Sequence, residues 1–202
     1  LNMGTLSKKW IGSMIMAGKK AKSTGKPVVF DPVGAGASNY RTKTAEKIIS
    51  QVKPNVIRGN ASEIMVLAQL STISKGVDST SETSEAIQGA KILSKKLDCT
   101  IVISGAVDCI VTGNTVNTIG NGSPLMSKVT GMGCTATSII GACIAVEKNI
   151  HKAAVSAMAI MGVVGEKTEE LSKGPGSFQA NFLDTLHNIN SEEIKSKTNL
   201  DG

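Results

Sequence analysis

The chain has 202 residues, of which 41% are apolar and 19% are charged, values that are typical of one globular domain. No apolar run approaches the ~20 residues that a membrane-spanning helix needs, so we expect no membrane association. The net charge of +6 comes from lysines spread over helix-like segments, and only 2% of the residues are aromatic, which argues against a nucleic-acid-binding surface.

The sequence starts with Leu1-Asn2-Met3-Gly4, without the basic and apolar regions of a signal peptide, so we expect a cytoplasmic protein. These residues read like the end of a strand that has already begun. We therefore expect this chain to be the greater part of a longer one.

The four cysteines occur singly, and no C-x-x-C pair is present, so neither a disulfide framework nor a zinc site is predicted. Three of them, Cys99, Cys109 and Cys143, are expected to be small buried residues. Cys134 has a different setting, described below.

Strand and helix patterns alternate along the chain. Short apolar strands are expected at 27–30, 55–57 and 100–104, and a hairpin at 109–119 around Gly113-Asn114. The expected helices span about 8–22, 42–52, 61–70, 82–97, 134–147, 152–171 and 179–189. This order predicts an α/β fold with a mostly parallel central sheet and helices on both faces. One domain over residues 1–190 and a frayed, polar tail over 191–202 are expected.

The loop after the first strand carries an aspartate and several small residues. Asp31 directly follows the buried run, and glycines and alanines fill the segment up to Ser38. Glycines allow a close backbone approach to phosphate, and an aspartate here can hold a hydrated magnesium ion. The alternative is a plain turn in which the aspartate caps local amides.

The loop after the second strand reads Arg58-Gly59-Asn60-Ala61-Ser62-Glu63. Arg58 has the fork geometry that binds a nucleotide phosphate, or it forms an ion pair between strands. Asn60 and Glu63 have the spacing of a capping box, which is a purely structural use of both side chains. The residues alone leave these alternatives open.

The loop after the third strand, Ser104-Gly105-Ala106, gives a weaker signal and fits a plain turn.

A glycine-containing segment, Thr130-Gly131-Met132-Gly133-Cys134-Thr135, leads into an apolar helix. Free amides at a helix N-terminus, together with the helix dipole, form an anion site, and the two glycines let these amides converge. The alternative is a helix entrance with a small buried thiol. This segment is the most informative one in the sequence.

Taken together, these loops resemble those of hydroxyethylthiazole kinases of the ribokinase-like superfamily. The matching stretches are 1–6, 31–38, 56–63, 121–125, 131–134 and 174–178. The resemblance covers nearly the whole chain, and it implies a ribokinase-like fold for the kinase domain at residues 1–190. It also implies transfer of phosphate from ATP to the primary alcohol of 4-methyl-5-hydroxyethylthiazole in thiamine salvage.

The resemblance implies roles for four strand-end residues. Arg58 and Ser104 would contact ATP, and Asp31 and Glu63 would organise Mg²⁺ and its waters around the phosphates.

The resemblance also implies the roles at the helix entrance. Gly131 would contact the thiazole, and the segment from Gly131 through Gly133 to Cys134 would form the anion hole. Cys134 would face the substrate hydroxyl as a base or as an orienting group.

Further expectations follow from the resemblance. Homotrimers with active sites between subunits are expected, as is a missing strand-helix-strand segment before Leu1 that could leave the isolated chain poorly active. The 174–178 segment also occurs where this kinase is fused behind a thiamine phosphate synthase. The alternatives are a hydroxymethylpyrimidine kinase of the same superfamily and a fragment that binds nucleotide without turnover.

Overall fold

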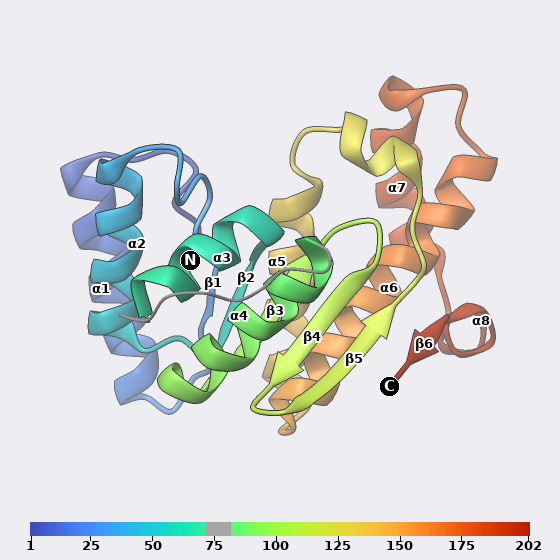
Figure 1. Ribbon diagram of the computed structural model, residues 1–202. Helices are drawn as coiled ribbons and strands as arrows, with labels where there is room; N and C mark the ends of the chain where they lie inside the picture. The colour runs from blue at the N-terminus through green and yellow to red at the C-terminus, as the bar shows by residue number, and fades with distance from the viewer. Residues whose placement is uncertain (72–81) are drawn as a thin grey trace.

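A six-stranded sheet with helices on both faces organises the described part of the chain, residues 1–71 and 82–202 of a computed structural model (Figure 1). The strands follow one another across the sheet in chain order. They are β1 (Val29–Phe30), β2 (Val56–Asn60), β3 (Thr100–Ser104), β4 (Asp108–Thr112), β5 (Thr115–Ile119) and β6 (Leu200–Asp201). The α/β class with helices on both faces is thus confirmed.

The sheet is mixed. The pairs β1–β2 and β2–β3 are parallel, and an isolated parallel bridge from Asn2 to Asp31 extends this half. The pairs β3–β4, β4–β5 and β5–β6 are antiparallel. The sheet is therefore not mostly parallel, as its sequence had suggested, but parallel only over the strands joined by helices. The short connection from β3 to β4, the expected hairpin at Gly113 and the later β6 add antiparallel neighbours.

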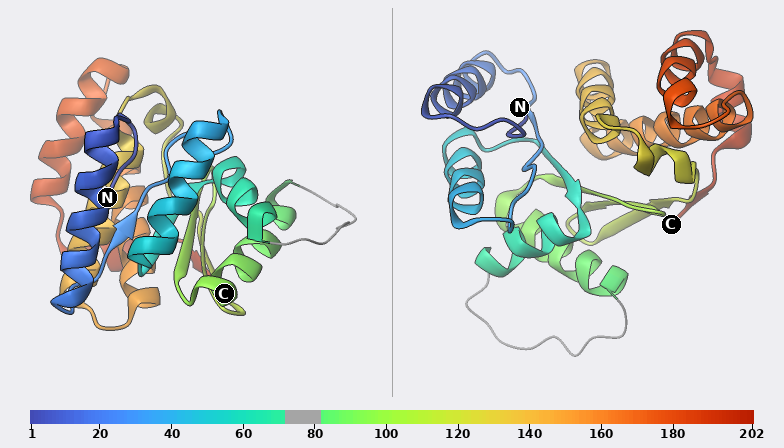
Figure 2. Two further views of the ribbon diagram at one scale, coloured as in Figure 1. Left: turned by 90° about the vertical axis from the view of Figure 1, so that its left-hand side faces the viewer. Right: turned by 90° about the horizontal axis from the view of Figure 1, so that it is seen from above.

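The helices form two layers (Figure 2). One layer packs on the first face of the sheet and consists of α1 (Lys8–Ser23), α2 (Asn39–Val52), α3 (Ala61–Ser71) and α4 (Glu82–Leu97). The other consists of α5 (Met132–Val146), α6 (Ile150–Glu170) and α7 (Pro175–Asn188). Among the helices with described bounds, none combines the length and apolar character that a membrane crossing requires.

Neighbouring residues of a strand pack alternately against the two helix layers. Val56 belongs to the cluster beneath α5 to α7, whereas Ile57 belongs to the cluster beneath α1 to α4. Val102 and Ile101 divide in the same way one strand further along. Because successive side chains of a strand point to opposite faces, these continuous apolar runs fill two cores at once.

The C-terminal residues differ from the frayed tail expected from their polarity. Helix α8 (Ser191–Lys197) begins at Asn190, whose side chain accepts hydrogen bonds from the amides of Glu192 and Glu193. Strand β6 then pairs with β5. A good helix cap and an open sheet edge therefore order a segment that has almost no apolar residues to bury.

Candidate active site

The N-terminus of α5 lies where the parallel strands end. Gly131 precedes the helix with φ 96°, a left-handed conformation that glycine adopts without strain, and no side chain caps the first turn. The helix starts at Met132, two residues before the expected start at Cys134. Amides of a first helical turn have no partner within the helix, so this end can receive an anion.

Arg58 of β2 joins three of the residues that the sequence singled out. Its Nη2 donates to Ser104 Oγ at 2.5 Å, and its Nη1 lies 3.7 Å from Asp31 Oδ2. A Cβ at Gly133 would come within 2.6 Å of the same Nη1. The guanidinium therefore lies against the first turn of α5, and the ion pair that was one of the two alternatives for Arg58 exists with Asp31. Its Nε is buried without a hydrogen-bond partner.

Asp31 is buried at the end of β1, with 1% of its surface exposed. Its Oδ2 accepts hydrogen bonds from Asn2 Nδ2 and Thr137 Oγ1, both at 3.0 Å. Burial raises the pKa of this carboxyl, and the charge of Arg58 and the Thr137 hydrogen bond oppose that rise. Its Oδ1 is buried and has no hydrogen-bond partner. An orphaned carboxylate oxygen of this kind fits a hydrated cation.

Glu63 forms the capping box that its spacing predicts. Its Oε2 accepts from the Asn60 amide at 2.9 Å, and Asn60 Oδ1 accepts from the Glu63 amide at 2.9 Å. Its Oε1 accepts from the amide of Gly34 at 2.7 Å. Glu63 thus ties the loop after Asp31 to the start of α3. Each of its oxygens accepts one hydrogen bond and keeps a second lone pair.

The described residues contain no group of three or more His, Cys, Asp or Glu side chains placed to hold a metal ion. Magnesium sites often use one or two carboxylates and complete their coordination with substrate phosphates and water. Asp31 with Glu63 nearby is compatible with that pattern.

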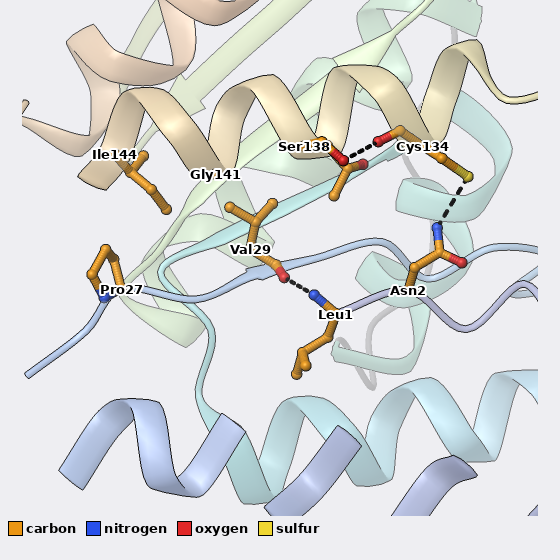
Figure 3. A pocket seen from close by; sticks show the side chains of 9 residues that line it. Leu1, Asn2, Pro27, Val29, Cys134, Ser138, Gly141 and Ile144 are labelled. Carbon is orange, nitrogen blue, oxygen red and sulfur yellow. Dashed lines mark hydrogen bonds between the residues drawn. The ribbon is translucent and has the colours of Figure 1, made fainter. Parts of the chain in front are cut away.

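Cys134 is exposed on the first turn of α5, and its Sγ accepts a hydrogen bond from Asn2 Nδ2 at 3.4 Å (Figure 3). The Asn2 Oδ1 accepts a hydrogen bond from the backbone amide of Gly4 at 2.8 Å. Because a backbone N–H can only donate, this bond fixes which end of the Asn2 side chain is the oxygen. Asn2 therefore connects Cys134 to Asp31.

The other three cysteines are free thiols as well, and burial raises the pKa of each. For Cys99 the pKa rises to about 12, through burial and then the charge of Asp98. Cys99 and Cys109 are buried as expected, whereas Cys143 is only half-buried. A buried neutral thiol is chemically inert, so Cys99 and Cys109 are structural.

Two cavities lie on different sides of the α5 N-terminus. The larger, about 800 Å³, includes Arg58, Ser104, Gly131 and Gly133 in its lining. The smaller, about 320 Å³, includes Asn2, Cys134, Thr137 and Ser138, and Figure 3 shows it between α5 and the strand of Val29. Consecutive residues of one helical turn, Gly133 and Cys134, thus face two different cavities.

The sequence missed four polar residues of this region. Thr137 lies one helical turn after Gly133, a spacing that could have placed it beside the site. Arg41 donates to the carbonyls of Met3, Gly4 and Val33, and so holds two loops together. Neither Arg41 nor Asn2 gave a local signal, because their partners lie far away in the chain.

Asp108 is the fourth, and it lines the larger cavity. Burial raises its pKa to about 6, while the Gly105 amide and the charge of Arg58 oppose the rise. Its Oδ1 accepts from the Gly105 amide at 3.0 Å and so holds the bend that follows Ser104 at the end of β3.

Comparison with known proteins is consistent with this geometry. The model of the Hydroxyethylthiazole kinase family matches residues 1–192. A hydroxyethylthiazole kinase of Leptospira biflexa is 49% identical over 199 residues, which are 98% of this chain and 74% of that protein. One of Nitratidesulfovibrio vulgaris is 45% identical over 197 residues, with the same coverage of 98% and 74%.

Solved structures have the same fold. The hydroxyethylthiazole kinase protein of Pyrococcus horikoshii superposes with a TM-score of 0.90 at 34% identity, over 99% of this chain and 74% of that one. A pyridoxal kinase of Staphylococcus aureus, solved in complex with AMP-PCP, reaches 0.59 at 20% identity, over 82% and 61%. The second likeness concerns the fold alone, and the ribokinase-like class predicted from the sequence is confirmed.

Proposed function

This chain belongs to the hydroxyethylthiazole kinase family, and from that membership we propose that it transfers a phosphoryl group from ATP to the hydroxyl of 4-methyl-5-hydroxyethylthiazole, a step of thiamine biosynthesis and salvage. The observation that carries the proposal is the position of the α5 N-terminus between two cavities. A donor in one cavity and an acceptor in the other would meet at Gly133 and Cys134. The kinase domain would comprise residues 1–190, and 191–202 would be an appendage to it.

The larger cavity is the proposed nucleotide site. Arg58 and Ser104 would contact ATP there, and the free amides from Gly131 to Gly133 would receive the migrating phosphoryl group. A guanidinium and a helix N-terminus that face one point stabilise negative charge as it spreads over the phosphoryl oxygens. Phosphoryl transfer needs little covalent help from the protein, so this positioning would supply most of the catalysis.

Asp31 is the proposed metal residue, because its Oδ1 is buried and has no other partner. Glu63 would orient water molecules around the ion while its oxygens hold the Gly34 and Asn60 amides. Bound Mg²⁺ would neutralise charge on the phosphates of ATP.

The smaller cavity is the proposed acceptor site. Cys134 would face the substrate hydroxyl as a base or as an orienting group. Gly131, which lines the larger cavity, would contact the thiazole where the two cavities meet at the first turn of α5. Asn2 keeps the Cys134 sulfur beside Asp31, so the acceptor, the thiol and the carboxylate would share one short network.

We also propose a cytoplasmic homotrimer with active sites between subunits. Large apolar side chains exposed on α1 and α2, namely Trp10, Met16 and Tyr40, support an assembly that would cover them. Light scattering combined with size-exclusion chromatography tests the trimer.

The test of the function offers two alcohols to the protein with its native flanking sequence and Mg-ATP. Hydroxyethylthiazole should yield its phosphate, identified by mass spectrometry, whereas hydroxymethylpyrimidine should not react. Phosphorylation of the pyrimidine alone would point to the related kinase. Nucleotide binding without any product would point to a non-catalytic protein.

A further inference from the structure

A short loop at residues 120–123 connects β5 to the 3₁₀ helix η1 (Pro124–Lys128) and lines the larger cavity. Asn121, Gly122 and Ser123 all contribute to this lining, although the loop has no regular structure of its own. Gly122 has φ 149°, so the backbone turns in a way that favours glycine. What fixes this loop therefore fixes one wall of the cavity.

Asn121 is buried, with 6% of its surface exposed, and every polar atom of its side chain is engaged. Its Oδ1 accepts from the Asn199 amide at 2.5 Å. Its Nδ2 donates to the Lys197 carbonyl at 2.9 Å and to both Glu166 carboxylate oxygens at 3.1 Å. One buried amide thus joins the cavity wall to α6 and to the C-terminal residues.

The backbone of the loop is held by the same two neighbours. The Gly120 amide donates to the Asn199 carbonyl at 2.9 Å, and the Gly122 amide donates to Glu166 Oε1 at 3.1 Å. Close packing against α6 adds to this, since a Cβ at Gly162 would come within 2.6 Å of the Asn121 Cβ. The loop lies between α6 and residues 197–201.

We propose that Asn121 is a positioning residue for the nucleotide, and that it makes the docking of residues 197–201 a condition for tight nucleotide binding. The proposal rests on the proposed function, in which the larger cavity holds ATP. Asn121 does not need to touch the nucleotide. It holds the wall in one position, and any ligand that prefers that position stabilises the docked C-terminal segment in turn.

The structure offers a matched pair of variants at the far end of this contact. Asn199→Pro removes the backbone N–H that donates to Asn121 Oδ1. Thr198, with φ −64° and ψ 124°, already has the extended conformation that a residue before proline requires. Asn199→Ala removes the same side chain but keeps that amide. The two variants therefore differ in the hydrogen bond to Asn121. Asn121→Ala removes the acceptor itself.

The readout is the dissociation constant of Mg-ADP, measured by calorimetry on the whole protein, so no phosphorylation is needed. Asn199→Pro should weaken Mg-ADP binding by roughly tenfold, the equivalent of one buried hydrogen bond. Asn121→Ala, which also loses the bonds to Lys197 and Glu166, should weaken it by at least as much. Asn199→Ala should stay within about twofold of the native protein. The double variant Asn121→Ala with Asn199→Pro should bind no more weakly than Asn121→Ala alone, because Asn121→Ala already lacks the contact that Asn199→Pro removes.

A split in the kinetic constants adds a second readout. The KM for ATP should rise in Asn199→Pro, while the KM for hydroxyethylthiazole stays within about twofold, since the smaller cavity has no contact with this loop. If Asn121→Ala does not fold, the Asn199 pair still decides the question.

Equal Mg-ADP binding by Asn199→Pro and Asn199→Ala would overturn the proposal, as would fully additive effects in the double variant. Native-like nucleotide binding in all variants would leave the proposed function intact. A native protein that binds no Mg-ADP would overturn both.

Discussion

The guanidinium of Arg58 lies so close to Gly133 that any side chain at that glycine would displace it, with a Cβ only 2.6 Å from Nη1. Two positive ends, a guanidinium and a helix N-terminus, thus share one small region. Asp31, 3.7 Å from Nη1, is the nearby counter-charge. Such an arrangement attracts a further anion, and the phosphates of ATP have the required charge.

Gly133→Ala tests this arrangement. The Arg58 side chain can move away from the new methyl group, so the fold should survive, but its contacts with Ser104 and Asp31 should be lost. We expect kcat/KM to fall by roughly tenfold or more, because a positioned phosphate-binding group is displaced. Gly12→Ala on α1, where a Cβ meets nothing within 4 Å, is the control and should have native activity. Native kinetics for Gly133→Ala would refute the role given to Arg58.

Cys134→Ala should slow turnover without abolishing it. A thiol is a modest base, so its removal should lower kcat by roughly 10²-fold, while the amides and Arg58 still stabilise the phosphoryl group. Steady-state kinetics and a separate Mg-ADP titration measure the two effects. Complete loss of turnover with nucleotide binding intact would show that Cys134 is indispensable to the chemistry.

Asp108→Asn should stabilise the protein at neutral pH. The folded-state pKa of Asp108, about 6, lies above its ordinary value of 3.8. The contribution of the protonated carboxyl to the free energy of unfolding is therefore fully present below pH 3.8 and is lost as the pH rises through about 6. Asparagine still accepts from the Gly105 amide. The free energy of unfolding at pH 7.5 should therefore rise by up to about 3 kcal/mol relative to the native protein.

Urea unfolding across pH 3.5–8 measures this difference. The gain should shrink as the pH falls below 6 and vanish near pH 3.5. A gain that does not depend on pH would show that the charge of Asp108 is not its source.

Glu63→Gln should destabilise the fold even without magnesium. Glutamine has one donor end, so it cannot accept from both the Gly34 and the Asn60 amides, and one buried amide loses its partner. We expect a loss of about 1–3 kcal/mol in the free energy of unfolding, measured in EDTA. Ser62→Ala is the matched control, because the Ser62 Oγ hydrogen bond to Asn60 Oδ1 is exposed, and Asn60 Oδ1 keeps the Glu63 amide when that bond is lost, so the cost should be about 0.5 kcal/mol or less. If the free energy of unfolding of Glu63→Gln in EDTA is unchanged, the structural role is refuted and only a role toward the metal ion remains for Glu63.

Local sequence patterns predicted most of the elements and the positions of the strand-end loops. β3 and α4 have the expected bounds, and the Asn60–Glu63 capping box formed as its spacing indicated. These features depend on residues within a few positions of each other. The helix start at Met132 was missed because a glycine can stand either before a helix or within its first turn.

Long-range contacts could not be predicted in this way. Asn2 and Cys134 are 132 residues apart, and Thr137 and Asp31 are 106 apart. Such pairs depend on how strands and helices dock, which no local pattern specifies. The ordered C-terminal segment was missed for the same reason, since β6 is held by the edge of β5 rather than by its own composition.

The most direct test of the central claim, that donor and acceptor meet at Gly133 and Cys134, is ADP release by the protein with Mg-ATP, with and without hydroxyethylthiazole. The account predicts release that depends on the thiazole and that is reduced, but not abolished, in both Gly133→Ala and Cys134→Ala. No thiazole-dependent release by the native protein would contradict it.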